Sequence, residues 1–583
     1  MLLLCGIPLF FMELAIGQYF NRGAVRSWTK MCPAFTGIGI AMLIISAFIS
    51  IYYNVIIAWS FYYFVTSMKS EVPYKTCGNP WNSPLCLEPG RNATLLCMDL
   101  GLTNCTMQLT TPSVEYWRNF ILQVTSGIEV PGEIRPPLAL ALFVAWVIVF
   151  SCVLYGIRSS GKVAYFSATF PYVLLAILIV RGATLPGAYD GIMFYLTPDF
   201  SILLNPQAWV DAASQIFFSL SCGLGGLIVF GSYNDFHNNC QKDAVFVSII
   251  NCFTSFFGGF ATFTVIGFVA HTLEKDVKHV ISSGPGLAFV VYPESIAQMP
   301  ISPLWSVLFF FMLFLLGIDS QFVFIETIMS CLTDEFKLVK NHKKMTLAGL
   351  CCIFYLLGLS CVTQGGVYVF HIMDKQSGGL SLIFVSIFEC IVIGWFYGVD
   401  RFSENIQEML GKRPSLYFRL CWKYISPTVV TLIFLWSIIQ YKGLTFEEYV
   451  YPVSGELFGW GLALLSMLSI PLYALWYIVR LPGSCATRIK TGFRSIESPV
   501  TWDVEQQWSQ YQSTSVTGRF SRPTFKIPTF HHSIPSSSAS VADVHSMNKE
   551  KIDVPNRCES TPMDLRKLAI LRSMGLHLQI SKV

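Results

Sequence analysis

Four acidic residues stand inside long apolar stretches or at their edges: Glu13, Asp319, Glu326 and Glu389. A charge inside a bilayer costs several kcal/mol unless it is paired. The centres of these stretches contain almost no Lys or Arg that could serve as a partner. Asp319 directly precedes Ser320, and hard cations such as Na⁺ favour carboxylate and hydroxyl oxygens. We interpret this pair as a cation site; an ion pair or a protonated acid are the alternatives.

A second unusual stretch is "SLSCGLGG", residues 219–226, where small residues interrupt an otherwise apolar segment. In lipid, an unwound backbone is tolerated only where it is buried in protein or lines a cavity. Such a break can bind a substrate or an ion through freed carbonyls and half-helix ends. Close packing of small residues between helices explains the same composition. The acidic residues in the neighbouring apolar stretches favour the first interpretation, a broken helix that binds a substrate or an ion.

The elements that carry these residues are membrane spans. Of the 583 residues, 53% are hydrophobic and only 13% are charged, and the mean hydropathy is +0.54. A span needs about 20 mostly apolar residues, and about eleven stretches qualify. Their centres lie near residues 10, 50, 147, 172, 220, 257, 317, 354, 388, 430 and 468. The composition indicates a polytopic protein of the lipid bilayer and argues against a nucleic-acid partner. No Ser/His/Asp set, metal-spaced cluster or phosphate loop suggests an enzyme.

One long polar loop, residues 67–137, separates the second and third spans. It contains the glycosylation acceptor patterns "NAT" at Asn92 and "NCT" at Asn104, which require the extracellular or lumenal face. It also contains four cysteines that could pair in three ways; these are Cys77, Cys86, Cys97 and Cys105.

The basic residues favour the same orientation, because Lys and Arg gather in short cytoplasmic loops. Four such groups lie opposite the polar loop: Arg22, Arg26 and Lys30; Arg158 and Lys162; Lys337, Lys340, Lys343 and Lys344; and Arg401, Lys412 and Arg413. Residues 481–583 are rich in Ser, Thr and Pro, and we expect a cytoplasmic, largely disordered tail. The same orientation starts the first span outside, directly at Met1 and without a signal peptide. We therefore expect one further span before this sequence.

Several motifs in order resemble the sodium- and chloride-dependent neurotransmitter transporter family. They include "GIPLFFMELAIGQYF", "SGKVAYFSATFPYV", "RGATLPGA", "GSYNDFHNNC", "SGPGLAFVVYPE" and "LGIDSQF", and the resemblance runs from Met1 to about residue 480. It implies an all-α membrane protein with inverted repeats, in which this chain supplies all but the first of twelve helices. The transporter domain would be residues 1–480, multi-pass in the plasma membrane. A homo-oligomer is left open.

The resemblance also implies ion ligands, with Na⁺ and Cl⁻ as co-transported ions. One sodium would be held by Ser219 and Asn251, and a second by Leu316, Asp319 and Ser320. The residues that resemble chloride ligands are Tyr19, Gln215, Ser219, Asn251 and Ser255. Prokaryotic relatives have an acid at the position of Ser255. Because serine is neutral, a chloride would be needed to balance the cations.

For the substrate, the resemblance implies a small zwitterion bound by Tyr53, Phe218, Ser221 and Leu224, with Glu389 as the acidic half of an outer gate. It also selects Cys77–Cys86 as the loop disulfide. The motifs favour a GABA-like substrate carried by alternating access. A glycine or broader neutral amino-acid symporter is the alternative, as is a transport-inactive, truncated partner of a full-length relative.

Overall fold

The structure is a computed structural model. It describes residues 1–89, 96, 109–154, 157–272, 276–280, 286–447 and 449–494, with only the backbone of residues 157–164 and 279–280. The predicted glycosylation sites Asn92 and Asn104, two of the loop cysteines and most of the predicted tail lie outside these residues. Their assignments stay predictions.

Ten helices in the described part of the chain are long and apolar enough to cross a membrane. Each is one element or a run of consecutive α, 3₁₀ and π segments. They are η1–α1 (Leu2–Gly6, Ile7–Phe20), η2–α3 (Pro33–Phe35, Thr36–Thr66), α6 (Pro136–Val153), α7 (Ile157–Ala183), α11 (Cys240–Thr272), α14 (Ser302–Glu335), α16–η7 (Lys343–Gly358, Leu359–Val362), α17–η8–α18–η9 (Gly366–Lys375, Gln376–Leu380, Ser381–Ile391, Val392–Phe396), α20–η10–α21 (Leu416–Leu420, Cys421–Ile425, Ser426–Ile439) and α22 (Val453–Arg480). The predicted all-α membrane fold is confirmed. The eleventh expected span, near residue 220, is two short helices, α9 (Pro206–Ser219) and α10 (Gly226–Ser232).

Short elements connect the spans. They are α2 (Ala24–Met31), α5 (Pro112–Glu115), η4 (Tyr116–Leu122), α8 (Ala188–Leu196), η5 (Phe200–Leu204), α12 (Val277–Val280), η6 (Leu287–Val291), α13 (Tyr292–Ala297), α15 (Lys337–Asn341), α19 (Val399–Leu410) and α23 (Cys485–Gly492). Two strands, β1 (Thr445–Phe446) and β2 (Tyr449–Val450), pair antiparallel, with Thr445 opposite Val450.

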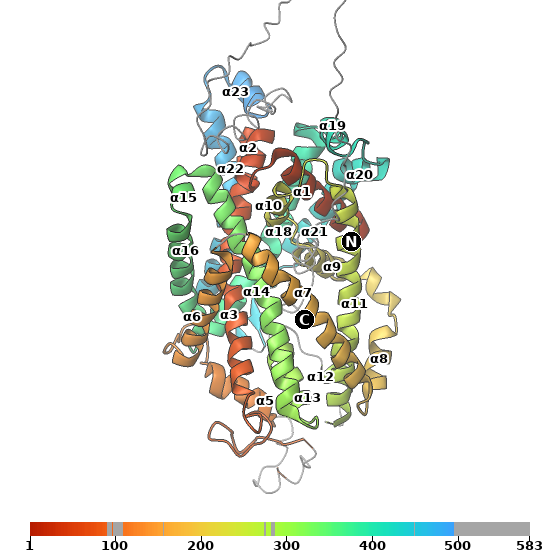
Figure 1. Ribbon diagram of the computed structural model, residues 1–583, viewed down its shortest axis with the longest axis vertical. Helices are drawn as coiled ribbons and strands as arrows, with labels where there is room; N and C mark the ends of the chain where they lie inside the picture. Colours follow the sequence, from red (N-terminus) through yellow and green to blue (C-terminus); the bar gives the residue numbers. More distant parts are fainter. Residues whose placement is uncertain are drawn as a thin grey trace, which may run out of the picture. The chain divides into compact units, whose positions relative to one another are not determined.

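Helix α3 lies at the centre of the packing and runs beside α14 (Figure 1). Its aromatic side chains explain this position. The Trp59 ring meets Trp117 edge-on at 5.1 Å, and the Tyr63 ring stacks on Phe310 of α14 at 4.5 Å. Both Trp59 and Tyr63 are fully buried. Buried aromatic rings contribute large apolar areas, so this cluster holds α3 against α14 and against the polar loop.

In the polar loop, Cys77 and Cys86 form a disulfide, which is the pairing that the resemblance implies. The buried carboxylate of Glu115 organises the residues around it. It accepts hydrogen bonds from Asn82 Nδ2 (3.0 Å), from the Ser83 backbone N–H (2.8 Å) and hydroxyl, and from Thr110 Oγ1 (2.7 Å). These hydrogen bonds connect the disulfide loop to Glu115, the last residue of α5.

Candidate substrate and ion site

The interruption between α9 and α10 follows from its glycines. Gly223 and Gly225 have φ angles of 78° and 77°, and Ser221 has a φ of 58°. Glycine occupies this left-handed region readily, whereas other residues pay about 1 kcal/mol or more. Every residue from Ser219 to Gly226 is buried. The break that the sequence predicts is therefore present and faces the protein interior.

Neighbouring helices satisfy the backbone groups that the break frees. Ser46 on α3 donates its hydroxyl to the Leu224 carbonyl (2.9 Å). Glu13 on α1 accepts a hydrogen bond from the Gly223 N–H through Oε1 (2.7 Å). A buried, unpaired backbone group costs about as much as a lost hydrogen bond, so these two side chains stabilise the unwound conformation.

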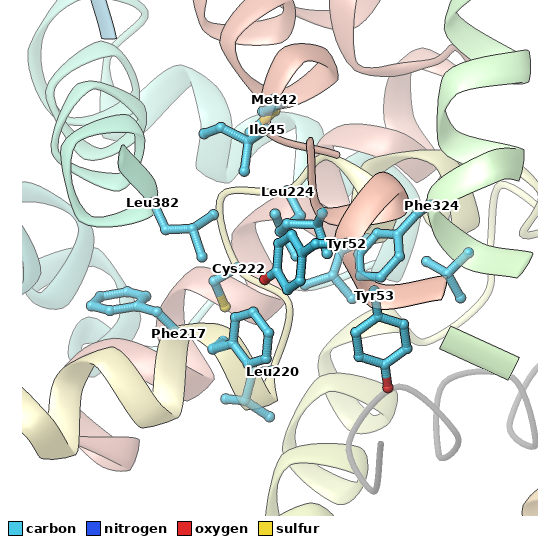
Figure 2. Packing of buried hydrophobic residues seen from close by; sticks show 14 of the residues in the cluster. Met42, Ile45, Tyr52, Tyr53, Phe217, Leu220, Cys222, Leu224, Phe324 and Leu382 are labelled. Carbon is cyan, nitrogen blue, oxygen red and sulfur yellow. The ribbon is translucent and has the colours of Figure 1, made fainter. Parts of the chain in front are cut away.

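Apolar and aromatic side chains surround the interruption. Figure 2 shows Leu224 and Cys222 of the break among the buried side chains of Tyr52 and Leu382. The Tyr53 ring meets Phe324 of α14 edge-on at 5.9 Å. All four residues predicted to bind substrate are buried; these are Tyr53, Phe218, Ser221 and Leu224. A small ligand held here would be largely enclosed by rings and by the unwound backbone.

The first predicted sodium site joins α9 to α11. Asn251 Nδ2 donates to Ser219 Oγ (2.7 Å), and both residues are buried. The Asn251 Oδ1 atom is buried and has no hydrogen-bond partner among the described residues. A buried acceptor without a donor is unfavourable. The carbonyl oxygen of this amide therefore fits a cation ligand beside the last residue of α9.

The second predicted sodium site lies on α14. Leu316, Asp319 and Ser320 are all buried, and Asp319 Oδ1 accepts a hydrogen bond of 2.5 Å from the Ser167 hydroxyl. The side chain of Tyr53 neighbours both Asp319 and Ser320. A carboxylate, a hydroxyl and a main-chain carbonyl form an oxygen donor set that suits a hard monovalent cation. No group of three His, Cys, Asp or Glu that could hold a transition metal occurs in the described residues.

Four of the five predicted chloride ligands belong to the α9–α11 region. Gln215 is half-buried one turn before Ser219, and the Ser255 hydroxyl donates to the Asn251 carbonyl (2.9 Å). Ser255 also lines a cavity of about 290 Å³ that Leu316 lines from α14. The cavity therefore borders both predicted ion regions.

Tyr19, the fifth residue predicted as a chloride ligand, lies on α1 rather than in this region, and its role stays a prediction. Its hydroxyl donates to Glu408 Oε2 of α19 (3.2 Å), and its ring packs on Phe236, which follows α10. Gln215 lies on α9, on the other side of the interruption. In this conformation the Tyr19 hydroxyl faces a carboxylate, so anion binding would require Tyr19 to turn away from Glu408.

The position of Glu389 argues against its prediction as the acidic half of an outer gate. Glu389 is fully buried, and the charged group that it faces is Glu13. It lies toward the Phe396 end of its span. The other end abuts the polar loop, where the Gly365 N–H donates to the Pro131 carbonyl (3.0 Å). Near that end, Asp374 is half-buried beside Tyr52. Asp374 therefore suits a gate better than Glu389. In the sequence, this position is marked only by an acid followed by a lysine, Asp374 and Lys375, in the first part of the span.

Membrane-length helices, a buried break in one of them and buried oxygen atoms on its neighbours are together typical of a secondary transporter. Comparison with known proteins places the chain within this class. The chain belongs to the sodium:neurotransmitter symporter family, whose family model matches residues 1–481. The family consists of multi-pass membrane transporters, not enzymes.

Two kinds of relative illustrate the similarity. The sodium- and chloride-dependent creatine transporter 1 of Mus musculus is 42% identical over 522 residues, which cover 88% of this chain and 81% of the relative. The human protein of the same name has the same identity and coverage. The sodium- and chloride-dependent glycine transporter 1 of Xenopus laevis is 45% identical over 491 residues, which cover 82% of this chain and 77% of the relative.

Proposed function

We propose that this protein is a symporter that uses Na⁺ and Cl⁻ gradients to move a small zwitterionic carboxylate across the plasma membrane. The observation that carries the proposal is the junction of Ser219 and Asn251 at the unwound segment. There the Asn251 amide holds the end of α9 and leaves a buried oxygen for a cation. The names of the relatives support dependence on both ions.

In this proposal the two cations have different neighbours. Sodium at Ser219 and Asn251 would lie at the helix break, next to the substrate carboxylate. Sodium at Asp319 and Ser320 would stabilise the packing of α14 against the neighbouring helices. Chloride near Gln215 and Ser255 would offset the positive charge, since neither residue carries a charge of its own.

The substrate proposal favours glycine or creatine over GABA. The relatives named above are described as transporters of creatine and of glycine. Glycine and creatine both carry nitrogen on the carbon next to the carboxylate, whereas GABA separates these groups by a longer chain. The Phe324 ring against Tyr53 supports this choice, because it narrows the space on that side of the predicted carboxylate ligand.

The direct test is uptake into liposomes that contain the purified full chain. We expect labelled glycine or creatine to accumulate when Na⁺ and Cl⁻ are high outside, and accumulation to collapse when an ionophore dissipates the sodium gradient. Liposomes with the Asp319→Asn protein provide the matched control. Absence of sodium-stimulated uptake for glycine, creatine and GABA would contradict the proposal. Increased uptake by a co-expressed full-length relative would then favour the transport-inactive partner.

A further inference from the structure

Two carboxyl groups and a hydroxyl meet at the interruption without enough donors. Glu13 on α1 and Glu389 on α18 are fully buried, and they lie close enough for the charge of one carboxylate to act on the other. Glu13 Oε2, both carboxyl oxygens of Glu389 and the hydroxyl of Ser386 are buried and have no hydrogen-bond partner among the described residues. The same region includes Gly223, where an added Cβ would lie 3.1 Å from Ser386 Oγ.

Within the part of the chain that the structure describes, no positive charge compensates this pair. In the described residues, no Lys, Arg or His is among the groups that act on either carboxyl. The titratable neighbours are two thiols, Cys222 of the interruption and Cys390 of α18. Thiols supply no positive charge. Two neighbouring carboxylates in a dry interior do not both remain ionised, because desolvation and mutual repulsion act in the same direction.

We propose that Glu13 and Glu389 share one proton, which resides on Glu389. Glu13 already accepts the Gly223 N–H, and a hydrogen bond of this kind favours the ionised form of a carboxyl. No donor among the described residues points at Glu389, so it is the group that takes the proton. The protonated Glu389 donates to Glu13 Oε2, and the pair then carries a single negative charge. The site binds a proton and is separate from the two sodium sites proposed above.

The shared proton would join three elements. Glu13 holds the unwound backbone from α1, and Glu389 holds Glu13 from α18. Removal of the proton would place two negative charges beside Gly223 and push α18 away from α1. The conformation of the interruption would thereby depend on the protonation of Glu13 and Glu389, which are not among the predicted substrate and sodium ligands.

Infrared difference spectroscopy of the purified full chain tests the proposal, and it does not depend on transport. A buried protonated carboxyl has a C=O stretching band that an ionised carboxylate lacks. We expect Glu389→Gln to remove one such band, while the amide still donates to Glu13 and keeps the protein folded. Glu115→Gln is the matched control. It replaces a hydrogen-bonded carboxylate of the polar loop and should leave the band in place.

A second variant separates the two partners. Glu13→Gln keeps the proton on Glu389 but changes its acceptor, so we expect the band to shift in frequency. Identical spectra for the wild type and Glu389→Gln would overturn the proposal. A wild-type band that disappears when sodium is added would identify a cation site instead and would also overturn it.

Discussion

Asp319 combines burial with a specific partner, because its Oδ1 atom accepts the Ser167 hydroxyl on α7. We predict that Asp319→Asn lowers sodium-dependent uptake at least about 100-fold, which corresponds to about 2.7 kcal/mol. The amide keeps the shape but loses the negative charge that a cation requires. Ser167→Ala keeps the charge and removes one hydrogen bond, so we expect a loss of about tenfold. Uptake normalised to surface expression measures both, and equal losses would contradict the proposed role of Asp319.

A substitution at Ser255 tests the proposed chloride site. Its side chain is half-buried and lines the cavity near Leu316. Ser255→Glu would place a fixed negative charge where chloride is proposed, so we predict uptake that persists when chloride is replaced by gluconate. Ser255→Gln introduces a side chain of the same size without a charge, and we expect it to leave the protein dependent on chloride. Unaltered chloride dependence in the Ser255→Glu protein would contradict the proposed site.

For single residues, the sequence predicts which side chains are chemically unusual but not which residues they contact. The sequence identifies Asp319 and Asn251 as chemically unusual, because a polar group in an apolar span needs a reason. It does not reveal that Tyr19 faces Glu408, since the two residues are far apart in the chain. Glu389 and Asp374 share one span, and only the packing shows which of them is fully buried.

At the scale of elements, the break between α9 and α10 depends on glycine geometry. At Gly223 the φ is +78°, and an added Cβ would lie 3.2 Å from the Leu382 carbonyl oxygen. We predict that Gly223→Ala destabilises the folded protein by about 1–2 kcal/mol through backbone strain and crowding. Gly349→Ala in α16 is the control, because no atom lies within 4 Å of an added Cβ and alanine favours helices. Thermal unfolding in detergent compares the two, and similar melting temperatures would refute the strain.

The polar loop provides a pH-dependent element. Burial raises the pKa of Glu115, but the hydrogen bonds from Ser83, Thr110 and Asn82 outweigh it and leave the pKa below its usual value. A lowered folded-state pKa adds stability above the unfolded value of about 4.3, and this stability is lost as pH falls toward the folded value. We therefore predict that hydrogen-exchange protection of the Ser83 amide, corrected for intrinsic rates, decreases below about pH 4. In Glu115→Gln it should be lower at neutral pH and should not change across this range.

Elements were more predictable from the sequence than contacts. Hydropathy and length identify the ten continuous spans, and "SLSCGLGG" identifies the break, because both signals are local. The bonds that hold the break open are not local. Glu13 reaches Gly223, and Ser46 reaches Leu224, across about 200 residues of sequence. Which side chain meets the freed backbone depends on how the helices pack, and a motif does not contain that information.

For the molecule as a whole, side-chain contacts divide the connecting segments between two ends. At one end Gln364 Nε2 donates to Gln123 of the polar loop (3.0 Å), and Tyr449 donates to Glu129 (2.8 Å). At the other end the Phe493 ring after α23 packs on Phe35 at 5.2 Å, near the basic segment that contains Arg22, Arg26 and Lys30 (Figure 1). By the positive-inside rule, we propose that α23 lies on the cytoplasmic side.

This orientation predicts how thiols react in intact cells. Cys485 in α23 is exposed, and so is Glu71 in the polar loop. A membrane-impermeant maleimide should label the Glu71→Cys protein on intact cells, but should reach Cys485 only after the membrane is permeabilised. Comparison with Cys485→Ser isolates the signal of this one thiol from the other cysteines. Labelling of Cys485 on intact cells would reverse the proposed orientation, and with it the direction in which the ion gradients drive the substrate.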